Sequence, residues 1–471
     1  MRPRAAAFLE REAPLVGVLG LYAVVVCLTL PQQLVQDSWL TLASGREVVR
    51  HGLPTHDTLA VWTHGKTWVD QQWLAQLAFY GLDALGGLRL VLLGHALLLV
   101  AALASALAFA RRAGASARSV ALVALPAMLV APWALQLRAQ SFAPLLFVWV
   151  LGLLAADSRA PSWRVLWTLP LLVLWANLHG TVVLGAALVT WRGVTSLPRL
   201  RALPLLAAPL CLFASPYGLA LAGYYRRLLV NPLLPSFLDE WRSSAPSQRT
   251  AAFFVLAFAA IWLVARHGRG LGLFERGALL LTLVSALAAI RSIVWFGLAC
   301  VVLLPPLVDL ALPRLRLPAQ RAFAVAGVAA ATVVGLFSVA RPASAFVRDW
   351  PSGAAQAVAR YPEARVFADD RTADWLLWED PRLAGRVAYD VRFELFDDRQ
   401  FRALLAFRNR SGDGWRRAAA GYRIVTLDPQ EERPLERALL AEPGARLVYR
   451  GRGLDVLLRP LHPPALVSRV E

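Results

Sequence analysis

The chain has 471 residues, of which 58% are hydrophobic and 17% charged, and its mean hydropathy is +0.52. Soluble domains carry about a quarter of charged residues, so this composition excludes an ordinary soluble protein, a collagen-like repeat and an intrinsically disordered chain. The net charge is +18, of which residues 1–340 hold +15 and residues 341–471 only +3. Because the surplus lies in the apolar part, it indicates membrane topology rather than a nucleic-acid partner.

Apolar segments that approach the roughly 20 residues needed to cross a hydrocarbon core follow one another through residues 1–340. Arginines fill every second connection between them, beginning with the N-terminal Arg2, Arg4 and Arg11, and positively charged loops stay in the cytoplasm. We therefore predict a polytopic α-helical membrane protein with about 11 transmembrane helices, a cytoplasmic N-terminus and an extracytoplasmic tail. The predicted spans are 13–36, 88–110, 119–136, 141–156, 164–178, 180–192, 202–215, 251–265, 277–290, 292–312 and 322–340.

The first predicted extracytoplasmic loop covers residues 37–87 and contains interfacial helices. In its last part, residues 71–86, the polar side chains Gln72, Gln76 and Asp83 share one helical face, whereas apolar side chains occupy another. Sixteen amphipathic residues suit a helix in the membrane interface better than a further span. Counting this segment as a span would also place the next arginine cluster outside, against the charge rule.

Ionisable groups at the edge of a membrane usually face a bundle interior or a wet cavity. The outer mouth of the predicted bundle is therefore the candidate site. A structural alternative exists for several of its residues, since an arginine at a helix end can be a snorkelling anchor and a histidine can bond a carbonyl at a helix break. The candidate residues are Asp37, directly after the first span, Asp57 in the first loop, and Arg138, His179, Glu240 and Arg291 in short outer connections.

The first loop, DSWLTLASGREVVRHGLPTHDTLAVWTHGKTWVDQQWL, resembles that of GT-C-type glycosyltransferases, particularly bacterial relatives of the dolichyl-phosphate-mannose protein mannosyltransferases. This resemblance implies a GT-C-like transmembrane domain and an enzyme of the bacterial cytoplasmic (inner) membrane. Such an enzyme moves a sugar from a polyprenyl-phosphate carrier to an extracytoplasmic lipid, glycan or protein. The matching parts are Asp37, Gly45, HGLPTHD with Asp57, the Gly65 to Trp68 turn, Trp73-Leu74, LRAQSF around Arg138, NLHG at 177–180, DEW at 239–241 and DVRFELF at 390–396.

The resemblance implies that Asp37 is the catalytic general base, although Ser38 follows it where many relatives have a glutamate. Transfer from a lipid phosphate also needs cations that meet the charge of the leaving phosphate, and guanidinium groups bind phosphate in a bidentate fork. We predict that Arg138 and Arg291, with His179, bind this phosphate, and that Asp57 or Glu240 orients the acceptor. A divalent cation is left open, because acids and histidines are present without diagnostic metal spacing. No other cofactor is predicted.

After residue 340 the hydropathy falls and the charge becomes balanced, which predicts a soluble α/β domain over residues 341–471. No GxGxxG follows its strands, so a dinucleotide site is not expected. We predict that this tail covers the outer cavity and helps to receive the acceptor. The predicted strands are 364–368, 385–389, 422–427, 445–449 and 454–458, the last two as a hairpin, and the predicted helices lie near 352–360, 372–379, 398–410 and 431–441.

Alternatives to the glycosyltransferase are a non-catalytic GT-C-like scaffold in envelope assembly and a lipid-linked-glycan transporter or flippase. A transporter predicts charged residues near the midplane and an internal repeat, whereas the spans here are nearly free of charge. An O-antigen polymerase or ligase would concentrate its function in a later outer loop. The predicted partners are a polyprenyl-phosphate-linked sugar, membrane lipids and an unidentified acceptor, with no nucleic acid.

Overall fold

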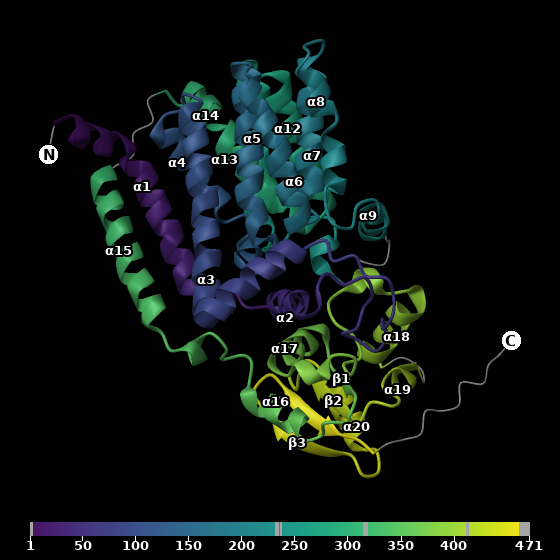
Figure 1. Ribbon diagram of the computed structural model, residues 1–471. Coiled ribbons are helices and arrows are strands. Elements are labelled where there is room, and N and C mark those ends of the chain that lie inside the picture. The colour runs from purple at the N-terminus through teal and green to yellow at the C-terminus, as the bar shows by residue number, and fades with distance from the viewer. Residues whose placement is uncertain (1–2, 231–234, 236–237, 314–318, 411–413, 461–471) are drawn as a thin grey trace. The chain divides into compact units, whose positions relative to one another are not determined.

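The computed structural model describes residues 3–230, 235, 238–313, 319–410 and 414–460 (Figure 1). The chain divides into two compact units. The first unit comprises Met1–Gln33, Leu82–Tyr225 and Val230–Pro342, and the second comprises Leu34–Gly81, Arg226–Leu229 and Ala343–Glu471. The second unit thus joins most of the first predicted loop to the tail, whereas the sequence-based division assigned that loop to the transmembrane domain.

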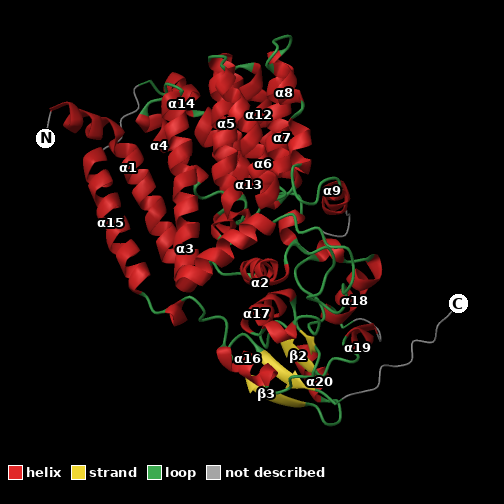
Figure 2. Cartoon of the chain, in the orientation of Figure 1, coloured by secondary structure: helices red, strands yellow, loops and turns green. Residues whose placement is uncertain are grey.

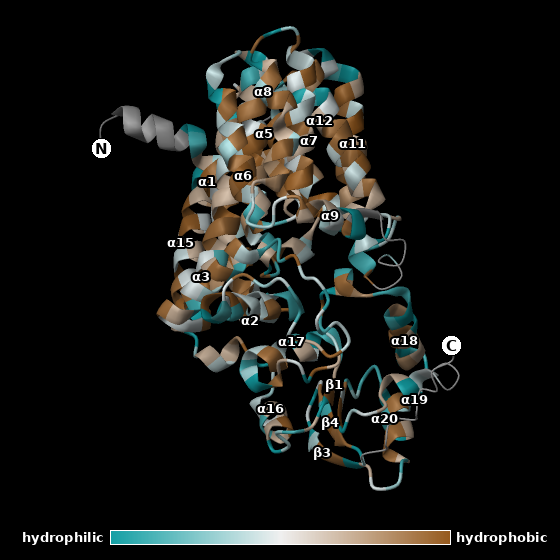
Figure 3. Cartoon of the chain, turned by 45° about the vertical axis from the view of Figure 1, so that its right-hand side comes forward, coloured by the Kyte–Doolittle hydropathy of each residue, from teal (hydrophilic) through white to brown (hydrophobic). Residues whose placement is uncertain are grey.

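The first unit is built from helices, and every predicted apolar span overlaps at least one of them. Among the residues that the structure describes, five helices are long and apolar enough to cross a membrane, and a sixth is added if α13 and α14, which are bent by 57°, count as one span. The chain is therefore a multi-pass helical membrane protein, and the total of eleven crossings stays a prediction. Apolar residues run along these helices (Figure 3). The bounds are α1 Pro3–Thr29, α3 Trp73–Arg112, α4 Ala117–Ala127, α5 Ala143–Arg159, α6 Thr168–Leu178, α7 Val182–Ser196, α8 Ala202–Leu206, α9 Ala220–Val230, α11 Ala251–His267, α12 Leu273–Ala288, α13 Ile293–Leu303, α14 Pro305–Ala311 and α15 Gln320–Ala340.

Helix α3 contains a break at Gly86 and Gly87. Gly86 has a φ of −154° and Gly87 a φ of +66°, and the left-handed region occupied by Gly87 favours glycine. The break separates residues 73–85, which include most of the predicted interfacial helix, from residues 88–112, which include the second predicted span. The break in the helix therefore falls where the sequence changes from an amphipathic to an apolar pattern.

Helices α1 and α15 lie side by side (Figure 1), and glycines let their backbones approach closely. A Cβ atom added to Gly20 would lie 2.5 Å from the carbonyl carbon of Gly327, so only glycine fits there. Gly17 is similarly close to the ring of Phe323. Small residues at helix crossings are typical of membrane bundles, where close van der Waals packing replaces the hydrophobic driving force.

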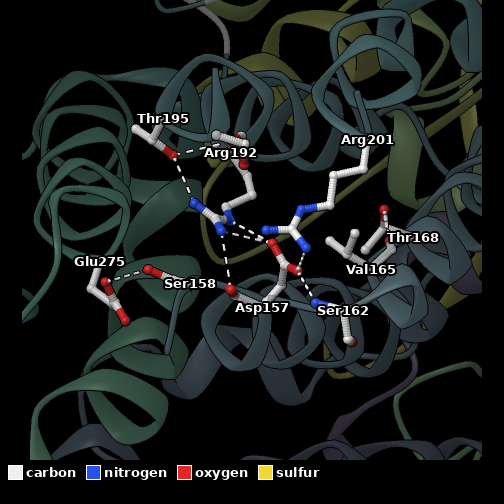
Figure 4. A network of polar contacts seen from close by, with 10 residues as sticks. Asp157, Ser158, Ser162, Val165, Thr168, Arg192, Thr195, Arg201 and Glu275 are labelled. Carbon is white, nitrogen blue, oxygen red and sulfur yellow. Dashed lines mark hydrogen bonds and ion pairs between the residues drawn. The ribbon is translucent and has the colours of Figure 1, made fainter. Parts of the chain in front are cut away.

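A buried polar network joins α5, α7 and α12 near the end of α5 (Figure 4). Arg192 of α7 donates from Nε to Oδ2 of Asp157 at 2.8 Å and from Nη2 to the Asp157 carbonyl at 3.0 Å. The other carboxylate oxygen of Asp157 accepts a 2.7 Å bond from the Ser162 amide, and the Ser158 hydroxyl donates to Glu275 of α12 at 3.0 Å. These hydrogen bonds engage both carboxylate oxygens of Asp157, which is buried among the helices.

The strands that the structure describes all belong to one sheet in the second unit (Figure 2). The strand order is β1-β2-β4-β3, with β1 parallel to β2 and the other pairs antiparallel. The predicted α/β tail is therefore present, and its last two strands form the predicted hairpin. The bounds are α2 Gln36–His51, α16 Ser352–Ala359, α17 Asp370–Glu379, α18 Asp398–Arg408, α19 Gly414–Ala418, α20 Arg433–Leu440, β1 Val366–Phe367, β2 Ile424–Leu427, β3 Arg446–Arg450 and β4 Asp455–Leu458.

The predicted strand 385–389 is not one of these strands. Val387 forms isolated parallel bridges with Val366 of β1 on one side and with Ala60 of the first loop on the other. The Val387 carbonyl accepts a 2.8 Å bond from the amide of Val61. The segment thus links the edge of the sheet to residues 60–62, which explains why an apolar run that resembles a strand has only one-residue pairings.

Candidate functional site

Three of the predicted site residues meet in the first unit. Nη1 of Arg138 donates to Oε2 of Glu240 at 2.7 Å, and Nη1 of Arg291 lies 3.6 Å from Oε1 of the same carboxylate. All three side chains are only about a fifth exposed. Glu240 was expected to orient the acceptor, but in the structure it bridges the two arginines. One carboxylate therefore occupies the space between two guanidinium groups that were predicted to bind an oxyanion.

Short turns at the helix ends bring these residues together. Arg138 precedes the turn Ala139–Phe142 that leads into α5, Glu240 lies in the turn Asp239–Trp241, and Arg291 lies in the turn Ile290–Ser292 after α12. The last two turns are joined by a 3.0 Å bond from the Ile290 amide to the Arg242 carbonyl. Since α5 begins beside Arg138 and ends at Asp157 and Arg159, the site and the network of Figure 4 lie at opposite ends of this helix.

A third arginine and two tryptophans complete the cluster; of these, the sequence analysis named only Trp241, as part of DEW at 239–241. The guanidinium carbon of Arg291 lies 4.5 Å from the ring centroid of Trp241, and that of Arg249 lies 4.7 Å from the ring of Trp133. Such cation–π contacts orient an arginine without using its hydrogen-bond donors. Arg249 lies in a polar turn region, where a single arginine gives no distinctive sequence signal.

The arginines also determine the charge of Glu240. Burial alone would raise the pKa of this carboxyl group, but Arg291, Arg138 and, more weakly, Arg249 lower it below its usual value. Glu240 is therefore ionised at neutral pH. With three guanidinium groups and one carboxylate, the site carries a net charge of +2, which suits an anionic ligand.

His179 lies in the connection between α6 and α7 and is 8% exposed. Its Nδ1 accepts a 3.2 Å bond from the amide of Thr181 and lies 2.9 Å from the Thr181 hydroxyl. Burial, followed by the charges of Arg291 and Arg138, lowers the pKa of His179 well below its usual value. The ring is therefore neutral, and the bond to Nδ1 leaves the proton on Nε2. Near the arginines, His179 can contribute a neutral donor but no additional charge.

Asp37 belongs to the second unit, so the structure groups it with the tail rather than with the arginines. It lies in the first turn of α2 and is half-buried. A carboxylate is favourable at this position because the N-terminus of a helix carries partial positive charge. Among the charged groups close enough to interact with Asp37 are Asp370 and Asp374 of α17, which the sequence analysis did not connect with it.

Asp57, the other predicted acceptor-orienting residue, is fully buried in the second unit. Its carboxylate accepts bonds from Nη2 of Arg392 at 2.6 Å, from the Thr63 hydroxyl at 2.5 Å and from the Leu59 amide at 2.9 Å. Burial opposes ionisation, but these partners outweigh it and lower the pKa of Asp57 below its usual value. Since its oxygens are already engaged, the geometry favours a role in folding over contact with an acceptor.

Within the described ranges, no group of three or more histidine, cysteine, aspartate or glutamate side chains is arranged to hold a metal ion. The acids and histidines of the first loop belong mainly to separate local contacts. His51, for example, lies 3.0 Å from Glu47 on the same helix, and His56 bonds the neighbouring Thr55 hydroxyl. The structure thus identifies no residues to which the divalent cation considered from the sequence can be assigned.

Two solved structures align with this structure over most of the chain. ArnT from Cupriavidus metallidurans, solved with undecaprenyl phosphate bound, matches over 93% of this chain and 97% of its own, with a TM-score of 0.49 and 15% identity. The oligosaccharyltransferase of Archaeoglobus fulgidus in its apo form matches over 88% of this chain and 69% of its own, with a TM-score of 0.40 and 11% identity. No protein-family profile matches the chain. No curated protein matches its sequence.

Proposed function

We propose that this chain is a GT-C-type membrane glycosyltransferase that moves a sugar from a polyprenyl-phosphate carrier to an extracytoplasmic acceptor. The observation that carries the proposal is the cluster of Arg138, Arg291 and Glu240, whose carboxylate interacts with both guanidinium groups. A phosphate presents oxygens to a guanidinium group in the same planar, bidentate manner as a carboxylate. The resemblance of the first loop to GT-C enzymes supports the same function independently of this geometry.

The charge of the arginine cluster favours the leaving group over the donor. A sugar linked to a polyprenyl monophosphate is a phosphodiester with one negative charge, whereas the released phosphate monoester carries about −1.5 to −2 at pH 7. A site with a net charge of +2 therefore interacts more strongly with the phosphate as its second charge develops. Interactions that strengthen toward the transition state raise the rate of the chemical step rather than only the affinity for the substrate.

In this mechanism Asp37 is the general base. Its carboxylate takes the proton from the acceptor hydroxyl or amine while the acceptor atom attacks the anomeric carbon of the sugar. The bond between that carbon and the phosphate oxygen breaks, and its electron pair goes to the phosphate. Arg138 and Arg291 stabilise the negative charge that develops there.

The test is to incubate the purified protein in lipid nanodiscs with a panel of radiolabelled polyprenyl-phosphate sugars and a membrane-lipid extract as the acceptor source. We expect transfer with one donor, a loss of about 10²- to 10⁴-fold in Asp37→Asn, and a large loss in Arg291→Ala. Asp398→Asn, at an exposed position in the same unit as Asp37, is the matched control and should keep wild-type activity. Transfer within a few-fold of wild type in Asp37→Asn would exclude the base assignment.

The same experiment separates the proposed enzyme from the other classes. A scaffold would give no transfer with any donor, and mutation of Asp37 would have no measurable consequence. A flippase would move the labelled lipid across a vesicle membrane without changing its chemical form. Quantifying transbilayer movement and product formation in one preparation therefore distinguishes the three.

A further inference from the structure

Asp374 of α17 is a buried acid that the proposed mechanism does not use. Its side chain is fully buried, and within the described residues neither carboxyl oxygen has a hydrogen-bond partner. An ionised carboxylate in such a place is strongly disfavoured unless it is paired. The buried position of Asp374 therefore favours its neutral, protonated form.

Helices α2 and α17 pack against each other within the second unit. Near their C-terminal ends, Arg46 of α2 donates to the carbonyls of Leu377 at 2.6 Å and Trp378 at 2.8 Å. Arg46 also lies 4.9 Å above the Trp378 ring. Since the later parts of the two helices are held together in this way, their first turns, with Asp37 on α2 and Asp370 on α17, lie toward the same end.

Asp370 and Asp374 are four residues apart on α17 and therefore share one helical face. Like charges at this spacing repel each other, and Asp37 and Asp390 add two further acids to the surroundings of Asp374. The cation that acts on Asp374 is Arg392, which already bonds Asp390 and Asp57. One guanidinium group is thus shared among acids from the first loop and the tail.

These surroundings oppose a charge on Asp374. Burial, followed by Asp390, Asp370 and Asp37, raises the pKa of Asp374 well above its usual value, although Arg392 acts in the opposite direction. Asp370 is affected similarly, since burial and then Asp369 raise its pKa to about 7. When neighbouring acids cannot all ionise, the proton stays on the one whose charged form is least stable.

We propose that Asp374 is a positioning residue for Asp37: it holds the proton of this acid cluster, so that the half-buried Asp37 remains ionised and able to act as a base. The buried, unpaired carboxyl of Asp374 and the packing of α17 against α2 carry this inference. It rests on the proposed function only in calling Asp37 the base. The linkage between the two acids is a property of the folded protein and is measured without any substrate.

The experiment follows the carbonyl stretch of protonated carboxyl groups by infrared difference spectroscopy of the full-length protein in nanodiscs during a pH titration. Wild type should show a protonated-carboxyl band at neutral pH, to which Asp70 and Asp370 also contribute. The band should lose the contribution of one carboxyl in Asp374→Asn and keep its full intensity in the control Asp398→Asn. Asp37→Asn removes a negative charge from the surroundings, so the midpoint of the band should fall by about one pH unit, the size expected for coupled acids. A band insensitive to Asp374→Asn, or a midpoint unchanged in Asp37→Asn, would overturn the proposal.

The pH profile of transfer gives a second readout. Because Asp374 is neutral in this proposal, the neutral amide of Asp374→Asn should leave the acid limb of the profile where it is in wild type. If Asp374 were instead ionised and paired with Arg392, its replacement would move that limb to lower pH, and this result would also contradict the proposal. If no donor is turned over at all, the proposed function fails while the infrared result still decides the linkage.

Discussion

Asp57 of the first loop and Arg392 of the tail form a buried ion pair, with 2.6 Å between Oδ1 and Nη2, across 335 residues of sequence. Arg392 also donates from Nε to Oδ1 of Asp390 at 3.0 Å and lies 4.2 Å above the ring of Trp68. Two segments that are distant in sequence therefore depend on one guanidinium group. This contact is a more specific link between the loop and the tail than apolar packing alone could provide.

Removal of Arg392 should destabilise the second unit strongly. Arg392→Leu removes the guanidinium group that pairs with both Asp57 and Asp390, and breaking a buried ion pair in this way costs about 3–5 kcal/mol. We expect a lower unfolding temperature and faster proteolysis of the tail in detergent. The control Arg382→Ala removes an exposed arginine that pairs with Asp380 two residues away, and it should change stability little. Equal effects of the two substitutions would contradict the role given to Arg392.

Asp70 should make stability depend on pH in a defined direction. It is 2% exposed, its Oδ1 accepts a 2.7 Å bond from Gln76, and burial raises its pKa to about 7. Between the ordinary pKa of an aspartate and pH 7, the folded state holds a proton that the unfolded state has lost, so stability falls as the pH rises through this window. The neutral Asp70→Asn should therefore gain stability relative to wild type between pH 5 and pH 8, as measured by thermal unfolding at both values. If Asp70→Asn instead lost stability relative to wild type over this pH range, Asp70 would be ionised in the folded protein.

The crossing of α1 and α15 should not accept a methyl group at Gly20. The added Cβ would lie 2.5 Å from the backbone of Gly327, and overpacking costs about 1–3 kcal/mol. Gly335→Ala on α15 is the control, since a Cβ there meets nothing within 4 Å. Both substitutions bring the same gain in helix propensity, so the difference between their unfolding temperatures isolates the close contact. Similar temperatures would show that the helices separate without cost.

The arginine cluster should respond unequally to loss of its members. Arg291 is mostly buried and interacts with Glu240, so Arg291→Ala should raise the donor KM more than tenfold, since hydrogen bonds to charged groups contribute about 1.5–3 kcal/mol. Arg249 is exposed, and Arg249→Ala should raise the KM only about fivefold, consistent with about 1 kcal/mol for a solvent-screened charge.

The control for these two variants is Arg242→Ala, which removes an exposed arginine paired with Asp239 in the adjoining turn. It should leave the KM unchanged, because its structural contribution to the site is a backbone carbonyl. Competition by unlabelled polyprenyl phosphate gives an independent measure of the same affinities. A larger effect of Arg249→Ala than of Arg291→Ala would contradict the geometry of the cluster.

The hydrophobic pattern predicted the helices of the first unit well, because each apolar segment is a local property of the sequence. The break at Gly86 and Gly87 is also local, since a change from an amphipathic to an apolar pattern coincides with two adjacent glycines. Four of the five predicted tail strands form, and the exception, 385–389, failed because an apolar run does not reveal how many neighbours it pairs with. Its backbone bonds are divided between the sheet edge and the first loop.

The contacts that define the two units could not be predicted in this way. Asp57 was a candidate for acceptor binding because it is an acid in the loop predicted to be extracytoplasmic, and nothing near it in the sequence indicates Arg392 as its partner. Arg249 and Asp374 were missed for a related reason. Arg249 is an isolated arginine in a polar turn, and Asp374 is one of several polar residues on a short helix. Their surroundings come from segments far away in the chain.

The composite second unit has a consequence for how the protein is made. Asp57 leaves the ribosome long before Arg392, and at about 5–20 residues per second the interval is on the order of 20–70 s. During this time Asp57 lacks its charged partner Arg392, and Val61 lacks the Val387 carbonyl that its amide bonds in the finished protein. The contacts that complete the second unit can therefore form only after the segment containing Val387 and Arg392 has been translated.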